Sequence, residues 1–289
     1  MTPKVQLYEA TTATEQLINM WVHGKSANTA ELYRRSAKRF LEFVGKPLHV
    51  VSLVEVQAFA DHLAQQGRLS ASSQRSILAA VKSLLTFATK TGVLSVNVGA
   101  LVNPPKAKDT LNEKLLSELQ VMTMIAMETD LRNRAIVRTL YLLGLRVSEL
   151  CDLKWKDLQP RPNGGQLTVF GKGCKTRIVL VPASLWVELM QLQGDAGNDE
   201  PVFRSRKHNR DGHLSRIAVY EIVKEAAKRA GITRNVSPHC LRHSHASHSL
   251  DRGAPIHLVQ QTLGHASVGS TSRYLHARPT DSSSLYLPG

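Results

Sequence analysis

Two arginines, two histidines and a tyrosine lie in three short segments whose chemistry suits the handling of a phosphate. In the first segment Arg146 precedes Glu149 by three residues, so both side chains can lie on one face of a helix and pair. Gly144 ends the helical pattern before them, and several leucines surround the junction. A surface ion pair is the simpler interpretation, but a partly desolvated arginine is better suited to hold a phosphate.

The second segment begins with Ser237-Pro238, a pair that predicts the start of a helix, with Ser as N-cap and Pro in the first turn. His239 and Arg242 follow one turn apart and face the same way. The free backbone N–H groups and the dipole at this end of a helix also favour an anion. One location therefore offers an arginine fork, an imidazole and a helix N-terminus.

The histidines of this segment also raise the question of a metal site. His239 and His243 are four residues apart, and Cys240 lies between them. However, no Glu occupies the position that an HExxH motif requires, and no further Cys or His pair completes a ligand set. We therefore predict no metal site, and we assign His245 and His248 to packing or to the surface.

The third segment carries His265 and, further along, Tyr274. Gly264 ends a helical pattern that begins near Ile256, and Ser267 can cap the next helix. This places His265 in the corner between two helices and Tyr274 about two turns along the second. A lone tyrosine on a helix is usually a core or surface residue, so Tyr274 gains interest only beside the other two segments.

Together these residues predict the attack of a phenol on a phosphodiester. Tyrosine has a pKa of about 10, so it needs a base or a field of cations to lose its proton. Arginine forks can neutralise the non-bridging oxygens, and one such arginine in phosphoryl transfer changes the rate by about 10³–10⁵. Lys172, at the tip of a hairpin between predicted strands 166–170 and 177–181, can protonate the leaving sugar oxygen. The sequence has no carboxylate cluster typical of two Mg²⁺ ions and no P-loop, so we predict no cofactor.

The composition agrees with a nucleic-acid partner. The 289 residues carry 37 Lys and Arg against 23 Asp and Glu, a formal charge of +14. Such a charge favours a polyanion, although a diffuse solubilising charge is the alternative. The three cysteines are far apart and odd in number, which favours a reducing compartment. No apolar run approaches the ~18 residues of a membrane span and no signal stretch is found at the N-terminus, so we predict a cytoplasmic protein.

The remaining pattern predicts two domains. Residues 12–98 are helical throughout, with expected helices from Asn28-Thr29 to Val44, at 54–65 and at 72–91. Pro104-Pro105 marks a linker, which we place at residues 104–111, between an N-terminal domain of residues 1–103 and a catalytic domain of residues 112–289. In the second domain helical pattern is found at 112–128, 132–143 and 217–230, around the hairpin.

At this point the sequence resembles the tyrosine recombinase, or phage integrase, family, and especially its compact Xer-like members. The match follows the family's motifs in order and spacing, at residues 144–150, 171–175, 239–243, 263–265 and 273–274. The resemblance implies a catalytic set with one supporting glutamate: Arg146, Lys172, His239, Arg242, His265 and Tyr274, with Glu149. Two departures are Leu143 and Leu275, where a threonine is common in the family, and neither is expected to alter the chemistry.

The resemblance also implies a fold and a mode of action. The expected fold is mainly α with a small β-hairpin or sheet (α+β), in which a SAM-like helical core-binding domain and the catalytic domain clamp double-stranded DNA at specific sites. It implies a 3′-phosphotyrosine intermediate and a tetramer, of this chain or with a related recombinase, that passes through a Holliday junction. Two alternatives remain, a type IB topoisomerase and a catalytically silent DNA-binding protein of the same fold. The tail around Leu285-Tyr286-Leu287 is either a frayed terminus or a segment that docks on a neighbouring protomer.

Basic residues outside the catalytic set are expected to contact the DNA backbone, with a solvated surface as the plainer interpretation. They lie on the first two helical faces, beside the hairpin and in the dense basic loop 204–210: Arg34, Arg35, Lys38, Lys82, Lys175, Arg177, Arg206 and Lys207.

Overall fold

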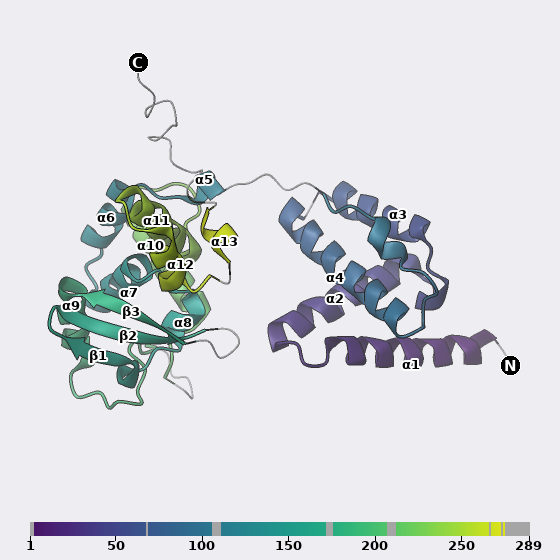
Figure 1. The fold of residues 1–289 in the computed structure, drawn as a ribbon, viewed down its shortest axis with the longest axis horizontal. Coiled ribbons are helices and arrows are strands. Elements are labelled where there is room, and N and C mark those ends of the chain that lie inside the picture. Colours follow the sequence, from purple (N-terminus) through teal and green to yellow (C-terminus); the bar gives the residue numbers. More distant parts are fainter. Residues whose placement is uncertain are drawn as a thin grey trace, which may run out of the picture. The chain divides into compact units, whose positions relative to one another are not determined.

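The structure is a computed structural model that describes residues 3–67, 69–105, 111–171, 176–206, 212–265, 267–272 and 274. The chain divides into two compact units, residues 1–108 and 109–289, and each is described by itself (Figure 1). None of the helices in the described parts of the chain is long and apolar enough to cross a bilayer.

The first unit is helical throughout its described residues, as predicted. Its elements are α1 (Pro3–Val22), α2 (Ala27–Val44), the 3₁₀ turn η1 (Leu48–Val50), α3 (Leu53–Gln65), α4 (Ala71–Lys90) and the 3₁₀ turn η2 (Val98–Leu101). Helix α2 starts earlier than expected, because Ser26 and not Asn28 stands at its N-cap. Gly45, in the left-handed conformation with φ 62°, ends it.

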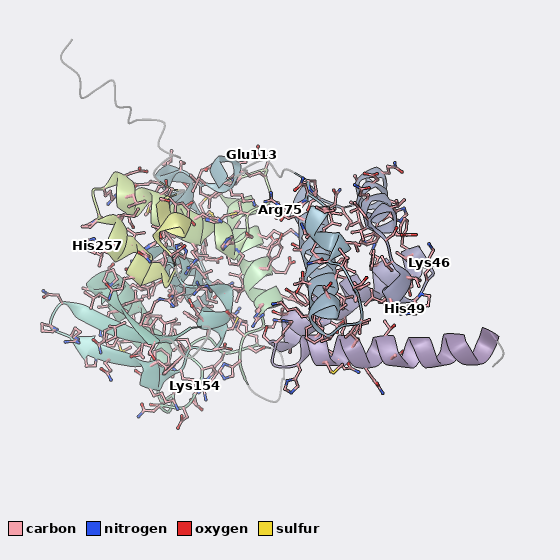
Figure 2. All side chains as sticks on the ribbon, turned by 45° about the vertical axis from the view of Figure 1, so that its right-hand side comes forward. Lys46, His49, Arg75, Glu113, Lys154 and His257 are labelled. Atoms are coloured by element: carbon pink, nitrogen blue, oxygen red, sulfur yellow. The ribbon has the colours of Figure 1, made fainter. Side chains whose placement is uncertain are left out.

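The core of the first unit forms where the apolar stripe of α2 meets α3 and α4. Ala37 and Phe40 on this stripe are 0% exposed, and the Phe40 ring packs edge-on against Phe59 of α3 at 5.1 Å between centroids. The opposite faces of the unit are charged, and Figure 2 shows exposed side chains such as Lys46 and Arg75 at its surface. The predicted amphipathic pattern is therefore confirmed for α2.

The second unit combines helices with one small sheet. Its helices are α5 (Leu111–Lys114), α6 (Glu118–Ala126), α7 (Leu131–Leu142), α8 (Val147–Cys151), α9 (Ala183–Gln193), α10 (Arg216–Arg229), α11 (Pro238–Asp251), α12 (Ile256–Leu263) and α13 (Val268–Ser272), with a 3₁₀ turn η3 (Trp155–Asp157). The strands β1 (Leu158–Arg161), β2 (Gly164–Phe170) and β3 (Thr176–Pro182) form an antiparallel sheet in the order β1-β2-β3.

The predicted hairpin is present as β2 and β3, whose register pairs Phe170 with Thr176 and Gly164 with Pro182. The tip of the hairpin, residues 172–175, lies outside the described residues. The inner face of β3 carries Val179 and Val181, which are buried, and α9 covers the sheet. Strand β1 and helix α9 were not predicted from the sequence.

Helix α11 is central to the second unit. It packs against α7 and α12, and eight of its residues are buried. Ser237 stands at its N-cap and Pro238 at its first position, as predicted. Gly144 (φ 59°) and Gly264 (φ 63°) turn the chain after α7 and α12, so that two helix ends converge on α11.

Candidate active site

Arg146 stands at the N-cap of α8, where its side chain remains 40% exposed. Its backbone N–H donates to Glu149 Oε2 at 2.7 Å, and its guanidinium donates to Glu149 Oε1 at 2.8 Å and to the Gly264 carbonyl at 3.1 Å. The predicted Arg146–Glu149 pair is therefore present. The exposed part of the guanidinium is open to a ligand.

Arg242 is the buried counterpart of Arg146, with a relative exposure of 2%. Its guanidinium donates to the Gly144 carbonyl at 2.5 Å and to the Leu263 carbonyl at 2.7 Å. Both acceptors lie at C-terminal helix ends, where carbonyls lack helical partners and the dipole favours a cation. Burial and the nearby charge of Arg146 lower the pKa of Arg242 to about 10, so it remains a cation at neutral pH.

Glu149 bridges the guanidinium groups of Arg146 and Arg177. It is 8% exposed and accepts from Arg146 and from both terminal nitrogens of Arg177, at 2.9 and 2.8 Å. Burial alone would raise its pKa, but the hydrogen bonds and charge of Arg177, with those of Arg146, lower it to about 2. Glu149 is therefore ionised and neutralises part of the charge of two arginines.

Arg177, which we expected at the DNA surface, occupies an internal position. Its side chain is 9% exposed, and its Nε donates to the Thr262 carbonyl at 2.7 Å. The alternation of β3 places Arg177 on the same face as Val179 and Val181, which points it inward. This argues for a supporting role through Glu149 rather than a direct DNA contact, and the period of two in the sequence is the signal that could have revealed it.

Two histidines lie beside these arginines. Burial, followed by the charge of Arg242, lowers the pKa of His239, and the same two causes lower the pKa of His265 to about 4. Both imidazoles are therefore neutral at pH 7. His265 also has Nδ1 at 2.9 Å from Thr271 Oγ1, which fixes the orientation of its ring.

Tyr274 lies against the histidines and is 4% exposed. Its ring is stacked with His265 at 6.4 Å between centroids, and its hydroxyl is 2.5 Å from His243 Nδ1. The expected helical position is wrong, because α13 ends at Ser272 and the Tyr274 backbone N–H closes a turn on Thr271 O at 3.0 Å. The chain turns after α13 and brings the phenol back towards α11.

The structure thus brings five predicted residues together from separate segments: Arg146, His239, Arg242, His265 and Tyr274. The charge of Arg146 acts on the pKa of His239, Arg242 and His265, and the group includes Glu149. Lys172 and Lys175 lie outside the described residues. His243 and Arg177 belong to the same cluster and were not assigned to the catalytic set from the sequence.

His245 and His248 have the packing role predicted for them. His245 Nδ1 is 2.8 Å from the Tyr141 carbonyl, and His248 Nδ1 is 2.9 Å from the Tyr141 hydroxyl. Burial lowers the pKa of His245 to about 4. Within the described residues no group of three or more His, Cys, Asp or Glu side chains is placed to hold a metal ion.

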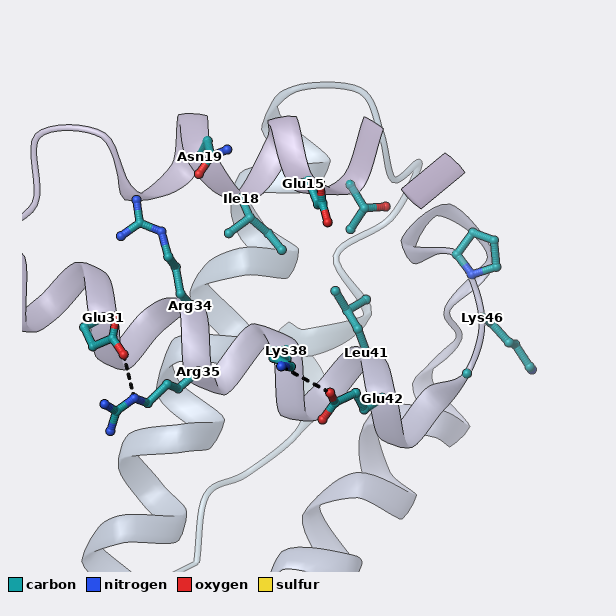
Figure 3. Close-up of a pocket in the computed structure, with 13 residues that line it drawn as sticks. Glu15, Ile18, Asn19, Glu31, Arg34, Arg35, Lys38, Leu41, Glu42 and Lys46 are labelled. Carbon is teal, nitrogen blue, oxygen red and sulfur yellow. Dashed lines mark hydrogen bonds and ion pairs between the residues drawn. The ribbon is translucent and has the colours of Figure 1, made fainter. Parts of the chain in front are cut away.

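The basic residues predicted on α2 line a groove of about 820 Å³ between α1 and α2 (Figure 3). Arg35 pairs with Glu31 at 2.7 Å and Lys38 with Glu42 at 3.8 Å, and both basic side chains are 77% exposed. Arg34 lines the same groove. Exposed pairs of this kind are worth only about 0.2–1 kcal/mol, so a DNA phosphate can displace the carboxylate.

The other residues predicted to contact DNA lie in different environments. Lys82 is half-buried and donates to the Val102 carbonyl at 2.5 Å, which directs its ammonium to the end of η2. Arg206 is 63% exposed and pairs with Asp130. Lys207 lies outside the described residues. DNA contact by these residues remains a prediction.

The sequence of the chain matches two known family profiles. The phage integrase family matches residues 113–281, and the phage integrase N-terminal SAM-like domain matches residues 15–90. The chain belongs to the phage integrase family. This integrase-family protein is 34% identical over 263 residues to tyrosine recombinase XerC of Xylella fastidiosa (strain M23), covering 88% of this chain and 87% of the relative. It is 35% identical to tyrosine recombinase XerD of Corynebacterium glutamicum over 274 residues, 88% of each chain.

Solved structures share the fold of this integrase-family protein. A lambda integrase dimer bound to a COC′ core site superposes with a TM-score of 0.76 at 19% identity, over 95% of this chain and 97% of that one. XerH recombinase bound to a palindromic difH substrate gives 0.72 at 22% identity, over 89% and 78%. The predicted fold class, mainly α with a small sheet, is therefore confirmed. These relatives give no support to the topoisomerase alternative or the binding-only alternative.

Proposed function

We propose that this protein is a site-specific tyrosine recombinase that cuts and rejoins DNA strands, with Tyr274 as the nucleophile. The observation that carries the proposal is the convergence of two arginines, two neutral histidines and one buried tyrosine from four parts of the second unit. This is the set that attack on a phosphodiester without a metal requires. The family membership and the Xer relatives support it.

The arginines have different tasks in the proposed reaction. Arg146 offers an exposed guanidinium to a non-bridging phosphate oxygen, while Arg242 supplies a fixed buried charge close by. Because both are anchored to backbone carbonyls before DNA arrives, no reorganisation is needed as negative charge develops. Glu149 accepts a hydrogen bond from the Arg146 guanidinium, and Arg177 in turn donates to Glu149.

The neutral histidines complete the phosphate site. In the tautomer in which the Thr271 hydroxyl donates to Nδ1, the Nε2 of His265 carries a proton that it can donate to a phosphate oxygen. His239 is one turn before Arg242 on α11 and interacts with the charges of Arg242 and Arg146, so we assign it to the same phosphate. We assign the leaving-group proton to Lys172, at the tip of the hairpin between β2 and β3.

In the proposed sequence Tyr274 Oη bonds to phosphorus, the bond to the 5′ oxygen breaks, and a 3′-phosphotyrosine remains. A 5′-hydroxyl of a second strand then attacks it, which conserves the bond energy and requires neither metal nor ATP. The partners are double-stranded DNA at specific sites and three further protomers, of this chain or a related recombinase, in a cytoplasmic complex. A lambda integrase tetramer bound to a Holliday junction has this fold, with a TM-score of 0.74 at 18% identity.

The test is covalent capture on a nicked suicide duplex that carries a candidate site from flanking DNA. The wild-type protein should give a covalent protein–DNA band, and Tyr274→Phe should bind the same duplex without forming one. A matched control is Tyr141→Phe, a second tyrosine of the same unit whose hydroxyl meets a histidine, and it should keep the band. A band that persists with Tyr274→Phe would place the nucleophile elsewhere.

A further inference from the structure

The hydroxyl of Tyr274 lies within hydrogen-bond distance of the ring of His243. Tyr274 Oη is 2.5 Å from His243 Nδ1, and the two ring centroids are 5.5 Å apart. A nucleophile and a base within hydrogen-bond reach, with the base oriented by a third group, is the usual arrangement for an activated hydroxyl. His239 supplies the third group, because its ring packs edge-on against His243 at 4.0 Å.

The other two histidines of the site are placed for different partners. His265 lies parallel to the Tyr274 ring, at 6.4 Å between centroids, and its Nδ1 is engaged by Thr271. His239 contacts His243 and lies in the field of Arg242 and Arg146. The Nδ1 atom of His243, by contrast, lies within hydrogen-bond distance of the attacking oxygen.

We propose that His243 is the general base that takes the proton of Tyr274. In this assignment His239 and His265 interact with the phosphate. This inference rests on the proposed recombinase function. As the Oη–P bond forms, the phenolic proton moves to His243 Nδ1. As the P–O5′ bond breaks, the 5′ oxygen takes a proton from Lys172. In rejoining, Lys172 accepts the proton of the attacking 5′-hydroxyl and His243 returns its proton to Tyr274.

Both titratable rings and charged side chains lie in the cluster around the pair. The titratable rings are those of His239 on the same helix and His265 before α13. The cations whose charge acts on His239 or His265 are Lys114 of α5, Arg146, Arg177 and Arg242, and the carboxylate of the cluster is Glu149, bonded to two of them. The charge of Arg242 interacts with Tyr274 and therefore favours the phenolate that forms.

The decisive variant is His243→Asn, because an asparagine oxygen near the position of Nδ1 can accept the hydrogen bond but cannot take the proton. His248→Asn is the matched control, since His248 lies on the same helix and its Nδ1 meets the Tyr141 hydroxyl at 2.9 Å. General-base catalysis contributes about 10²–10⁴-fold. We therefore expect His243→Asn to slow single-turnover formation of the covalent complex by about 10²-fold or more at pH 7, and His248→Asn to leave it unchanged.

Two further readouts separate a base from a structural residue. Without a base the rate should follow the fraction of phenolate, so in His243→Asn it should rise about tenfold per pH unit below the tyrosine pKa of about 10, while the wild-type rate reaches a plateau. A duplex with sulfur in place of the bridging 5′ oxygen needs no leaving-group proton. It should restore cleavage by Lys172→Ala and leave the defect of His243→Asn in place.

Each outcome decides between the two hypotheses. A wild-type rate and pH profile in His243→Asn, a faster rate, or rescue of this variant by the sulfur substrate would overturn the assignment of His243 alone. The absence of a covalent complex with wild-type protein on a duplex that it binds specifically would overturn the proposed function instead. Tyr274→Phe, which removes the reaction itself, should be inactive at every pH and with both substrates.

Discussion

Glu149→Gln is the variant whose effect can be worked out most fully from the structure. Glutamine keeps the shape and an acceptor for the Arg146 backbone N–H, but it removes the negative charge between Arg146 and Arg177. Glu149 is 8% exposed, so the charge interactions are poorly screened. Its pKa falls from 4.5 to about 2 despite burial, because Arg177 and Arg146 favour the carboxylate.

A pKa unit corresponds to about 1.4 kcal/mol, so this change is worth about 3 kcal/mol of folding free energy at pH 7. The folded-state pKa is lower than the unfolded value, so the contribution is present above pH 4.5 and disappears as the pH falls towards 2. From the two pKa values, the carboxylate still contributes about 1 kcal/mol to the folding free energy at pH 3. Glu149→Gln should therefore cost about 3 kcal/mol at pH 7 and much less at pH 3.

The assay is urea unfolding of the full chain at the two pH values, followed by tryptophan fluorescence. Of the three tryptophans, Trp21 lies in the first unit, while Trp155 and Trp186 lie in the second. A Trp21→Phe background therefore makes the signal report on the unit that holds the site. A loss of stability that is the same at pH 7 and pH 3 would refute the electrostatic reasoning.

Glu188→Gln provides the matched control. Glu188 is 5% exposed and pairs with Arg134 at 2.8 Å and Arg138 at 2.5 Å, between α7 and α9 and outside the catalytic cluster. Its loss should lower stability as well, because a buried pair is broken. Only Glu149→Gln, however, should also reduce covalent complex formation under conditions where both variants are folded.

Three other predictions follow from single features. Gly144→Ala should lower stability by at least about 1–2 kcal/mol in thermal unfolding, because φ is 59° and a Cβ would lie 2.8 Å from His245 and Leu263 side-chain atoms; an unchanged Tm would contradict the described turn. The ¹⁵N shifts of the His265 ring should show a neutral imidazole at pH 6, since its pKa is about 4, and an imidazolium at that pH would be at odds with its buried position. Neutralising Arg206 and Lys207 should weaken DNA binding and flatten the plot of log affinity against log salt, so an unchanged slope would exclude both residues from the interface.

Much of the fold could be predicted because the elements that position the site have strong local patterns. The apolar stripe of α2, the Ser237-Pro238 helix start and Gly264 at the end of α12 all lie where the sequence indicated. Strand β1 was missed because Leu158–Arg161 has three exposed residues and includes a proline, so it has no alternation to detect. Helix α9 has apolar residues on several sides, and its pattern is correspondingly weak.

The site was predictable where a motif has local spacing and not where the contacts link distant residues. His239 and Arg242 lie one turn apart, so their convergence follows from the helix alone. His243 contacts Tyr274 at a sequence separation of 31 residues, and Arg177 contacts Glu149 at a separation of 28. At such separations, local sequence patterns do not show which residues are in contact in the folded protein. Tyr274 was placed on a helix because no Gly or Pro lies between Ser270 and Arg273 to mark the end of α13 at Ser272.

The anchoring of Arg242 on the carbonyls of Gly144 and Leu263 has a consequence for substrate recognition. A free arginine side chain loses about 2 kcal/mol of rotamer entropy when it becomes fixed. In this protein the Arg242 side chain is already fixed in the folded state, so DNA binding does not carry this entropic cost. Because the acceptors are main-chain atoms, side-chain substitutions that keep the helix ends and the left-handed Gly144 in place leave the acceptors available. The phosphate-binding geometry of the second unit is therefore set before DNA binds.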